Sequence, residues 1–226
     1  YHGRWVGSIG RAGALSFNVF KTVTCGDGGM MLTDDTEVFE RAFAFHDQGH
    51  RPIRKGIEVG TRASLGLNFR MTELSGAVLG AQVARIGTIR DRLRANRDLF
   101  RSLIADLPSI SFRAQPDPAG DLGTFLTVLF PDEATARRVA GGLGSSVVAD
   151  SGWHVYNHME HLLSQRLAVD RGCPFDCATC GTAAPYHRNM LPQTDAVLAR
   201  AVNIGIGVDD VNLGSAFGVG IRDDES

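Results

Sequence analysis

The chain has 226 residues, of which 43% are hydrophobic and 21% are charged, and its formal net charge is −2. This is the composition of an ordinary folded protein with room for one large domain or two small ones. Nucleic acids and anionic membranes attract concentrated positive charge, and Lys and Arg are not clustered here, so the sequence argues against both as main partners. No apolar run approaches the length of a membrane span, and the first residues lack the hydrophobic core of a signal peptide. We therefore expect a cytoplasmic protein with no membrane partner.

The first half of the chain predicts a hairpin and then helices. Residues 14–20 and 30–33 have strand-like patterns on either side of a glycine-rich turn. Apolar periodicity with helix-start signals predicts three helices, over residues 37–46, from Thr72 onward and over residues 89–107, the last one ended by Pro108. The segment from His46 to Leu67 is too long for a passive connection, so we expect it to be functional.

The second half predicts alternating strands and helices. We expect strands over residues 124–130, 147–149 and 212–221 and helices over residues 132–143 and 193–204. This alternation indicates an α/β or α+β fold. The most economical division places a joint near residues 88–110, with one domain over residues 1–90 and a second, including a linker helix, over residues 91–226.

Lys21 is the first residue to suspect of chemistry. The chain has 23 Lys and Arg residues, and only two of them are lysines. A chain that uses arginine for nearly every cation keeps lysine preferentially where an amine must lose its proton and act as a nucleophile. A lysine that carries no function is the alternative.

The neighbours of Lys21 indicate a pyridoxal phosphate site. The residues between Ser16 and Lys21 include Phe17, Val19 and Phe20, and an apolar setting favours the neutral amine that Schiff-base formation requires. A hydroxyl and glycine-rich backbone N–H groups can hold a phosphate. The alternative is a solvent-facing lysine before an ordinary glycine turn.

Two motifs resemble those of the DegT/DnrJ/StrS family of pyridoxal-phosphate-dependent sugar aminotransferases. The first motif comprises Gly7, Gly10, Ser16-Phe17, Lys21-Thr22-Val23-Thr24 and Gly26-Asp27-Gly28-Gly29-Met30. The second is the run Gly66-Leu67-Asn68-Phe69-Arg70-Met71-Thr72. Asp27 stands where the family usually has glutamate, and Cys25 where a small or hydroxyl residue is usual. A looser similarity continues through residues 186–192.

The resemblance implies a fold and a set of roles. The expected fold is α/β, the C-terminal part of a fold-type I transferase that comprises part of the large mixed-sheet domain and the small C-terminal domain. Lys21 would bind the cofactor and act as the catalytic base, and Ser16 would bind the cofactor phosphate. Asn68 would reach the phosphate in the neighbouring subunit, which implies a homodimer with shared active sites. Arg70 is a candidate substrate residue, or else pairs with Glu73 or another carboxylate.

The resemblance also implies that the chain is the C-terminal part of a longer protein. The N-terminal part of family members carries the rest of the cofactor pocket, so we expect this chain alone to bind the cofactor poorly. The implied reaction moves an amino group from glutamate or glutamine to a keto sugar or cyclitol, in the biosynthesis of a cell-surface polysaccharide or an antibiotic. A truncated, non-catalytic remnant that acts as an interaction subunit is the rival hypothesis.

Three crowded cysteines leave further alternatives open. Cys173, Cys177 and Cys180 do not look like a secreted disulfide framework, which favours a reducing compartment. Their spacing is also that of radical S-adenosylmethionine enzymes, and a zinc site with His187 or His161 is conceivable. We favour neither metal and expect an irregular loop near the substrate, since some members of the resembled family have a similar run here.

Among the histidines, His154 is the one for which we expect a function. It lies near the place where members of the resembled family often present a histidine to the substrate. A structural histidine is the more ordinary interpretation of any one of these side chains.

Overall fold

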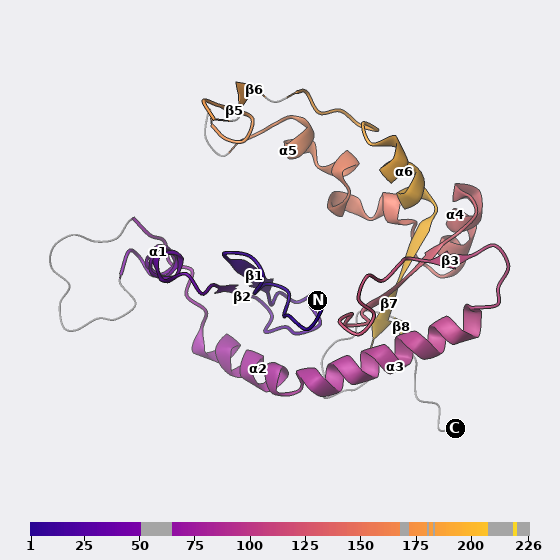
Figure 1. Cartoon of the computed structure of the whole chain (residues 1–226), viewed down its shortest axis with the longest axis horizontal. Coiled ribbons are helices and arrows are strands. Elements are labelled where there is room, and N and C mark those ends of the chain that lie inside the picture. Colours follow the sequence, from indigo (N-terminus) through magenta and orange to yellow (C-terminus); the bar gives the residue numbers. More distant parts are fainter. Residues whose placement is uncertain (51–64, 168–171, 180, 183, 208–218, 221–226) are drawn as a thin grey trace. The chain divides into compact units, whose positions relative to one another are not determined.

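The computed structural model describes residues 1–50, 65–167, 172–179, 181–182, 184–207 and 219–220. The chain divides into two compact units (Figure 1). The first comprises residues 1–99, 115–124 and 206–226, and the second comprises residues 100–114 and 125–205. The predicted domain boundary at residue 90 remains a prediction.

The first unit begins with the predicted hairpin. Strands β1 (Gly13–Ser16) and β2 (Gly29–Leu32) pair antiparallel, with Ser16 opposite Gly29. Helix α1 (Thr36–His46) follows, and the Asp35 side chain accepts a hydrogen bond from the Val38 N–H at its N-terminus. The predicted hairpin and helix are both confirmed.

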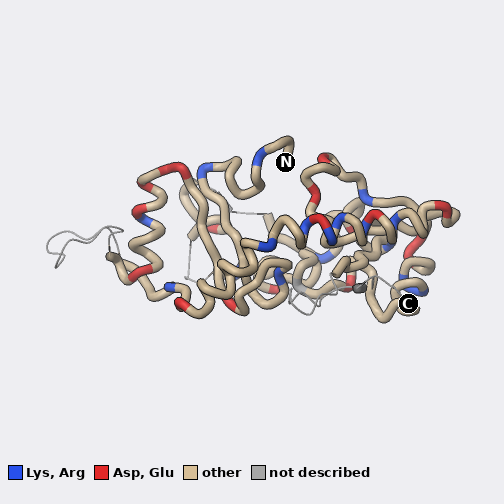
Figure 2. Tube along the Cα trace, turned by 90° about the horizontal axis from the view of Figure 1, so that it is seen from below, with Lys and Arg blue, Asp and Glu red and all other residues tan. Residues whose placement is uncertain are grey.

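Two consecutive helices follow the second sequence motif. Helix α2 (Glu73–Ala84) is capped by the Thr72 hydroxyl, which accepts from the Ser75 N–H. Helix α3 (Ile86–Ile104) begins and ends earlier than the helix predicted over residues 89–107. Its buried residues are Ile89, Leu93 and Arg97, one side of the amphipathic pattern. Figure 2 shows Lys and Arg interspersed with Asp and Glu along the chain, as in the Arg90–Asp91 ion pair of α3.

A polar anchor in the first unit fixes the segment around Asp121 against α3. The buried Arg97 pairs with the Asp121 carboxylate at 2.8 Å, and Arg94 donates to the Asp121 carbonyl oxygen at 2.7 Å. Arg97 also pairs with Asp98, so this buried guanidinium is balanced by two carboxylates.

The second unit contains most of a small sheet in the order β3-β4-β7-β8. Strands β3 (Ser111–Phe112), β4 (Phe125–Leu129) and β7 (Ala201–Gly207) pair antiparallel, while β8 (Val219–Gly220) pairs parallel with the last residues of β7. Helix α4 (Glu133–Gly142) follows β4 directly. Val128, Ala136, Ala140 and Val202 are buried and form part of the core.

The rest of the second unit is made of short elements. These are the 3-10 helices η1 (Val148–Asp150), η2 (Gly152–His154) and η3 (Tyr156–His158), helix α5 (Glu160–Leu163), the strand pair β5 (Asp176–Cys177) and β6 (Gly181–Thr182), and helix α6 (Pro192–Ala199). Among the described residues, no helix is both long and apolar enough to cross a membrane.

Two predictions about the second half are wrong. The predicted strand over residues 147–149 is instead the turn of η1. The predicted helix over residues 193–204 ends at Ala199, and β7 begins at Ala201. Pairing with β4 takes up the backbone groups of β7 and buries most of its residues, and this tertiary pairing overrides the helical pattern. Most of the predicted strand over residues 212–221 lies outside the described residues.

Candidate functional site

The loop that carries Lys21 is organised around Phe17. The Phe17 ring is buried, and its carbonyl oxygen accepts hydrogen bonds from the Cys25 N–H and the Thr24 hydroxyl, both at 3.0 Å. The Phe17 N–H donates to the Gly28 carbonyl oxygen at 2.9 Å. Through these hydrogen bonds, the end of the loop, residues 24–28, is held to the buried Phe17 at its start.

A tight turn places Lys21 at the tip of this loop. The Asn18 side-chain oxygen accepts from the Phe20 N–H at 3.1 Å, and its carbonyl oxygen accepts from the Lys21 N–H at 3.0 Å. Asparagine favours such turns because its side chain imitates a backbone acceptor. The Lys21 side chain is exposed, and within the described part of the chain it has no hydrogen bond or ion pair. The apolar setting expected from the sequence is not found, because Val19 and Phe20 are exposed as well. The amine faces solvent and is open to a reactant.

Ser16 lies at the base of the same loop. It is the last residue of β1, it is exposed, and it immediately precedes the buried Phe17. The structure therefore gives Ser16 a fixed backbone position and an accessible hydroxyl.

The second motif lies along the C-terminal end of α1. The Leu67 N–H donates to the Phe45 carbonyl oxygen at 2.8 Å, and the Phe69 N–H donates to the His46 carbonyl oxygen at 2.9 Å. Asn68, between them, forms an isolated bridge with Asp47 and is exposed. The backbone of α1 thus sets the position from which the Asn68 carboxamide projects.

Arg70 forms an ion pair with a carboxylate that sequence analysis did not single out. One of its guanidinium nitrogens, Nη1, lies 2.7 Å from Oδ1 of Asp47. The Asp47 side chain is 3% exposed, whereas that of Arg70 is 48% exposed. The sequence left the partner of Arg70 open as Glu73 or another carboxylate, and in the structure the partner is Asp47. The guanidinium has five N–H donors, so the pair leaves donors on its exposed side.

A hollow of about 760 Å³ in the first unit connects the two motifs. Its lining comprises Asp27, Gly28, Gly29, Met30, Met31, Phe39, Ala42, Phe43, His46, Phe69, Arg70, Met71, Thr72 and Ser75. Gly28 packs closely here, since a Cβ atom on it would lie 2.8 Å from the Met71 Cε atom. The loop after Lys21 and the segment after Arg70 are therefore in contact.

Sequence reasoning missed the α1 side of this hollow. The pattern places Phe39, Ala42 and Phe43 on one apolar stripe, which by itself indicates a buried face. In the structure Phe39 remains 47% exposed. The apolar stripe was therefore visible in the sequence, but only the folded structure shows that this stripe lines a hollow.

The structure places His154 in the second unit, whereas Ser16, Lys21, Asn68 and Arg70 are all in the first. His154 is the last residue of η2, and it is exposed. The structure thus groups four of the five predicted site residues in one unit.

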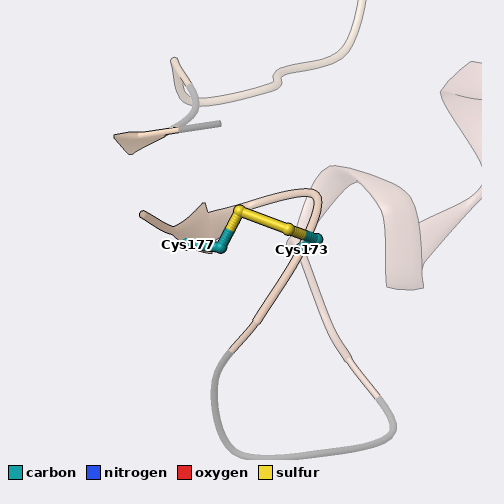
Figure 3. The surroundings of a disulfide bond; sticks show 2 residues. All are labelled: Cys173 and Cys177. Carbon is teal, nitrogen blue, oxygen red and sulfur yellow. A yellow bond between two sulfur atoms is a disulfide. The ribbon is translucent and has the colours of Figure 1, made fainter. Parts of the chain in front are cut away.

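The sequence did not indicate a disulfide, and the structure corrects this for one pair of cysteines. Cys173 and Cys177 form a disulfide, with their Cα atoms 5.2 Å apart (Figure 3). The separation of the Cα atoms lies in the range that disulfides require, which the spacing in the sequence did not reveal. Bonded sulfurs cannot serve as thiolate ligands, and no group of three or more His, Cys, Asp or Glu side chains in the described residues could hold a metal ion. Cys180 lies outside the described residues.

Comparisons with known proteins agree with the two motifs. GDP-perosamine synthase of Escherichia coli O157:H7 is 31% identical over 113 residues, which cover 49% of this chain and 29% of that protein. L-glutamine:scyllo-inosose aminotransferase of Streptomyces griseus is 27% identical over 161 residues, which cover 69% of this chain and 38% of that protein. The chain therefore spans well under half the length of these curated relatives.

The fold is also that of known aminotransferases. The X-ray structure of the aminotransferase from Psychrobacter cryohalolentis matches with a TM-score of 0.67 and 21% identity, covering 95% of this chain and 56% of that one. The predicted fold class, an α/β part of a fold-type I pyridoxal-phosphate-dependent transferase, is confirmed.

The profile of one family matches residues 1–151, the part of the chain that contains both motifs and the hollow between them. Members of this family are aminotransferases that use pyridoxal phosphate. The chain belongs to the DegT/DnrJ/EryC1/StrS aminotransferase family.

Proposed function

We propose that this chain carries the lysine side of an aminotransferase site that moves an amino group from glutamate or glutamine to a keto sugar or cyclitol. The observation that carries the proposal is the exposed Lys21 at the tip of a turn that buried Phe17 holds in place. A lysine kept as a plain surface cation would not need a loop closed at both ends by hydrogen bonds to one core residue.

The residues present fit pyridoxal phosphate by their donor chemistry. The Lys21 amine can bond to an aldehyde carbon, and the Ser16 hydroxyl and the Asn68 carboxamide can donate hydrogen bonds to phosphate oxygens. When bound, the cofactor supplies an electron sink for charge that develops on the substrate carbon. Lys21 would hold it in place, Ser16 of the same chain would orient it, and Asn68 would do so for the cofactor of the neighbouring subunit.

Lys21 is also our candidate for the catalytic base. A free amine at Nζ can take a proton from the substrate carbon and return one on the same face of the site. The short turn from Asn18 to Lys21 fixes the backbone position from which the Lys21 side chain extends.

The substrate class rests on the relatives and on two polar side chains. The printed names of the relatives refer to perosamine and scyllo-inosose, a sugar and a cyclitol, and one of them names glutamine. We assign Arg70 and His154 to the substrate side. The exposed donors of Arg70 could bind the carboxylate of an amino acid, because a guanidinium matches a carboxylate in two parallel hydrogen bonds.

The assembly that we propose is a homodimer with shared active sites, in which Asn68 serves the neighbouring subunit. We further propose a cytoplasmic enzyme of polysaccharide or antibiotic biosynthesis, without nucleic acid or membrane partners. The exposed position of Asn68 beside the C-terminal end of α1 supports this arrangement, because the residue is accessible to another chain.

Covalent labelling of Lys21 tests the proposal. The purified chain is mixed with pyridoxal phosphate, its absorbance is recorded before and after borohydride, and the modified peptide is mapped by mass. Because we expect this chain alone to bind the cofactor poorly, the cofactor is added in excess, and we expect a weak band near the visible edge that borohydride removes, with the label on Lys21. The chain has one other lysine, so Lys55→Arg is a matched control that should keep the label, while Lys21→Arg should lose it. Equal labelling of both lysines would argue against a built site.

A further inference from the structure

The Cys173–Cys177 disulfide lies in a short loop that backbone contacts also close. The Asp176 N–H donates to the Gly172 carbonyl oxygen at 2.9 Å, and the two residues form an isolated bridge beside the β5–β6 pair. These backbone contacts, in addition to the bond between the sulfurs, hold the two cysteines close together. Two thiols formed by reduction would therefore start from neighbouring positions in the same short loop.

This disulfide is poorly suited to a role in stability. The two cysteines are four residues apart, and a disulfide constrains the unfolded chain less when the loop it closes is short. Chains of this size build their own hydrophobic cores and seldom depend on such bonds. Another reason for the pair is needed.

The two cysteine residues differ in exposure. Cys173 is exposed, while Cys177 is partly buried in β5. Exposed disulfides are the labile and regulatory ones, whereas buried disulfides persist. The difference in exposure also sets the order in which the two cysteines react, since an external disulfide can reach Cys173 more readily than Cys177.

We propose that Cys173 and Cys177 form a reversible redox modification site that reacts with disulfide oxidants. The Cys173 thiolate attacks one sulfur of an external disulfide RSSR, releases one RS⁻ and forms a mixed disulfide. The Cys177 thiolate then attacks the Cys173 sulfur, forms the internal bond and releases a second RS⁻. Both cysteine protons pass to the released thiolates, so two cysteines are oxidised, and RSSR is reduced to two RSH.

Contacts of Phe175 link the disulfide loop to other residues of the second unit. Phe175, between the two cysteines, packs edge-to-face on Tyr186 with ring centroids 6.0 Å apart. Three residues after Tyr186, the Asn189 N–H donates to the Asn157 side-chain oxygen at 2.8 Å. Redox change at the cysteines should thus alter how Phe175 is held against Tyr186, at the start of a segment that is anchored to η3.

Thiol trapping in defined redox buffers tests the proposal. The chain is equilibrated with mixtures of reduced and oxidised glutathione, the free thiols are alkylated in acid, and the cysteine peptides are identified by mass. We expect a Cys173–Cys177 cross-link that forms with oxidised glutathione and disappears with excess dithiothreitol. Cys25→Ser is the control and should leave this behaviour unchanged.

Single variants separate the two steps. Cys177→Ser should accumulate a glutathione adduct on Cys173, and Cys173→Ser should form the adduct on Cys177 at least about tenfold more slowly. Both measurements use protein whose circular dichroism matches the unmodified chain. Trapping on the unmodified chain decides the matter if a variant does not fold. A cross-link to Cys180 in place of this pair, a stoichiometric zinc ion, or thiols that stay free in excess oxidised glutathione would overturn the proposal.

Discussion

At the scale of single residues, Gly66 determines how closely the Asn68 segment approaches α1. A Cβ atom on Gly66 would lie 2.4 Å from the Ala44 carbonyl oxygen and 2.5 Å from the Gly49 nitrogen. Both are backbone atoms that cannot rotate away, so the segment would have to move. We expect Gly66→Ala to lower the free energy of unfolding by about 1–3 kcal/mol, the usual effect of overpacking. Chemical denaturation measures it.

The same experiment has a matched control in Gly76→Ala. A Cβ atom on Gly76, within α2, would meet nothing within 4 Å. Alanine is the better helix former, so this change should raise the free energy of unfolding by about 0.5–1 kcal/mol. Equal effects of the two substitutions would show that close packing at Gly66 is unimportant.

The candidate site illustrates what residue patterns can and cannot predict. Ser16, Lys21 and Asn68 belong to local motifs, so the sequence alone is enough to make them candidates. Asp47 was not predicted, because its role depends on Arg70, 23 residues along the chain, being laid against the end of α1. Nothing in the local pattern around Asp47 distinguishes a buried ion-pair partner from an ordinary residue that ends a helix.

At the scale of elements, capping signals were more reliable than periodicity. Helix-start signals predicted the beginnings of α1 and α2, which Asp35 and Thr72 cap in the structure, because the capping bond is made within four residues. The helix predicted over residues 193–204 failed where β7 begins, since strand pairing with β4 involves residues about 75 positions away. Such distant pairing cannot be seen in a local pattern.

Helix α4 offers a test of capping by pH. The Asp132 carboxylate accepts a hydrogen bond from the Thr135 N–H at 2.7 Å, and this bond holds the pKa of Asp132 below its usual value. A carboxylate with a lowered pKa in the folded state stabilises the fold above its unfolded pKa of about 4, and this contribution disappears as the pH falls through the folded pKa. We expect Asp132→Ala to melt at a lower temperature than the unmodified chain at pH 7, with the difference shrinking at lower pH.

The asparagine variant at this position separates the cap from its charge. Asn is as good an N-cap as Asp but does not titrate, so Asp132→Asn should keep most of the stability at pH 7 and lose less of it in acid. Thermal melts followed by circular dichroism from pH 2 to 7 make the comparison. If Asp132→Ala and the unmodified chain differ by the same amount at every pH, the carboxylate charge plays no part in the cap.

At the scale of the whole molecule, the first unit exposes apolar side chains near Asn68 in the sequence. Leu65 is 90% exposed, Phe69 is 61% exposed and Leu74 is 81% exposed. Helix α2 itself has only one buried residue, Leu79, although its composition is largely apolar. A helix that is apolar on most sides is normally buried, so α2 requires a further surface to cover it. The proposed homodimer supplies one, because Asn68 is to reach a second subunit.

The oligomeric state of a Leu74→Glu variant tests whether a second copy provides that surface. The residue lies in the first turn of α2, where an acidic side chain suits the helix, so the fold itself should tolerate the change. Removing one buried leucine from an interface costs about 1.5–3 kcal/mol. We therefore expect the dissociation constant of the dimer, measured by sedimentation, to rise about ten- to hundredfold. Leu103→Glu is the control, since Leu103 is 71% exposed on α3, away from Asn68 in the sequence. An unmodified chain that is monomeric at all concentrations would contradict the dimer.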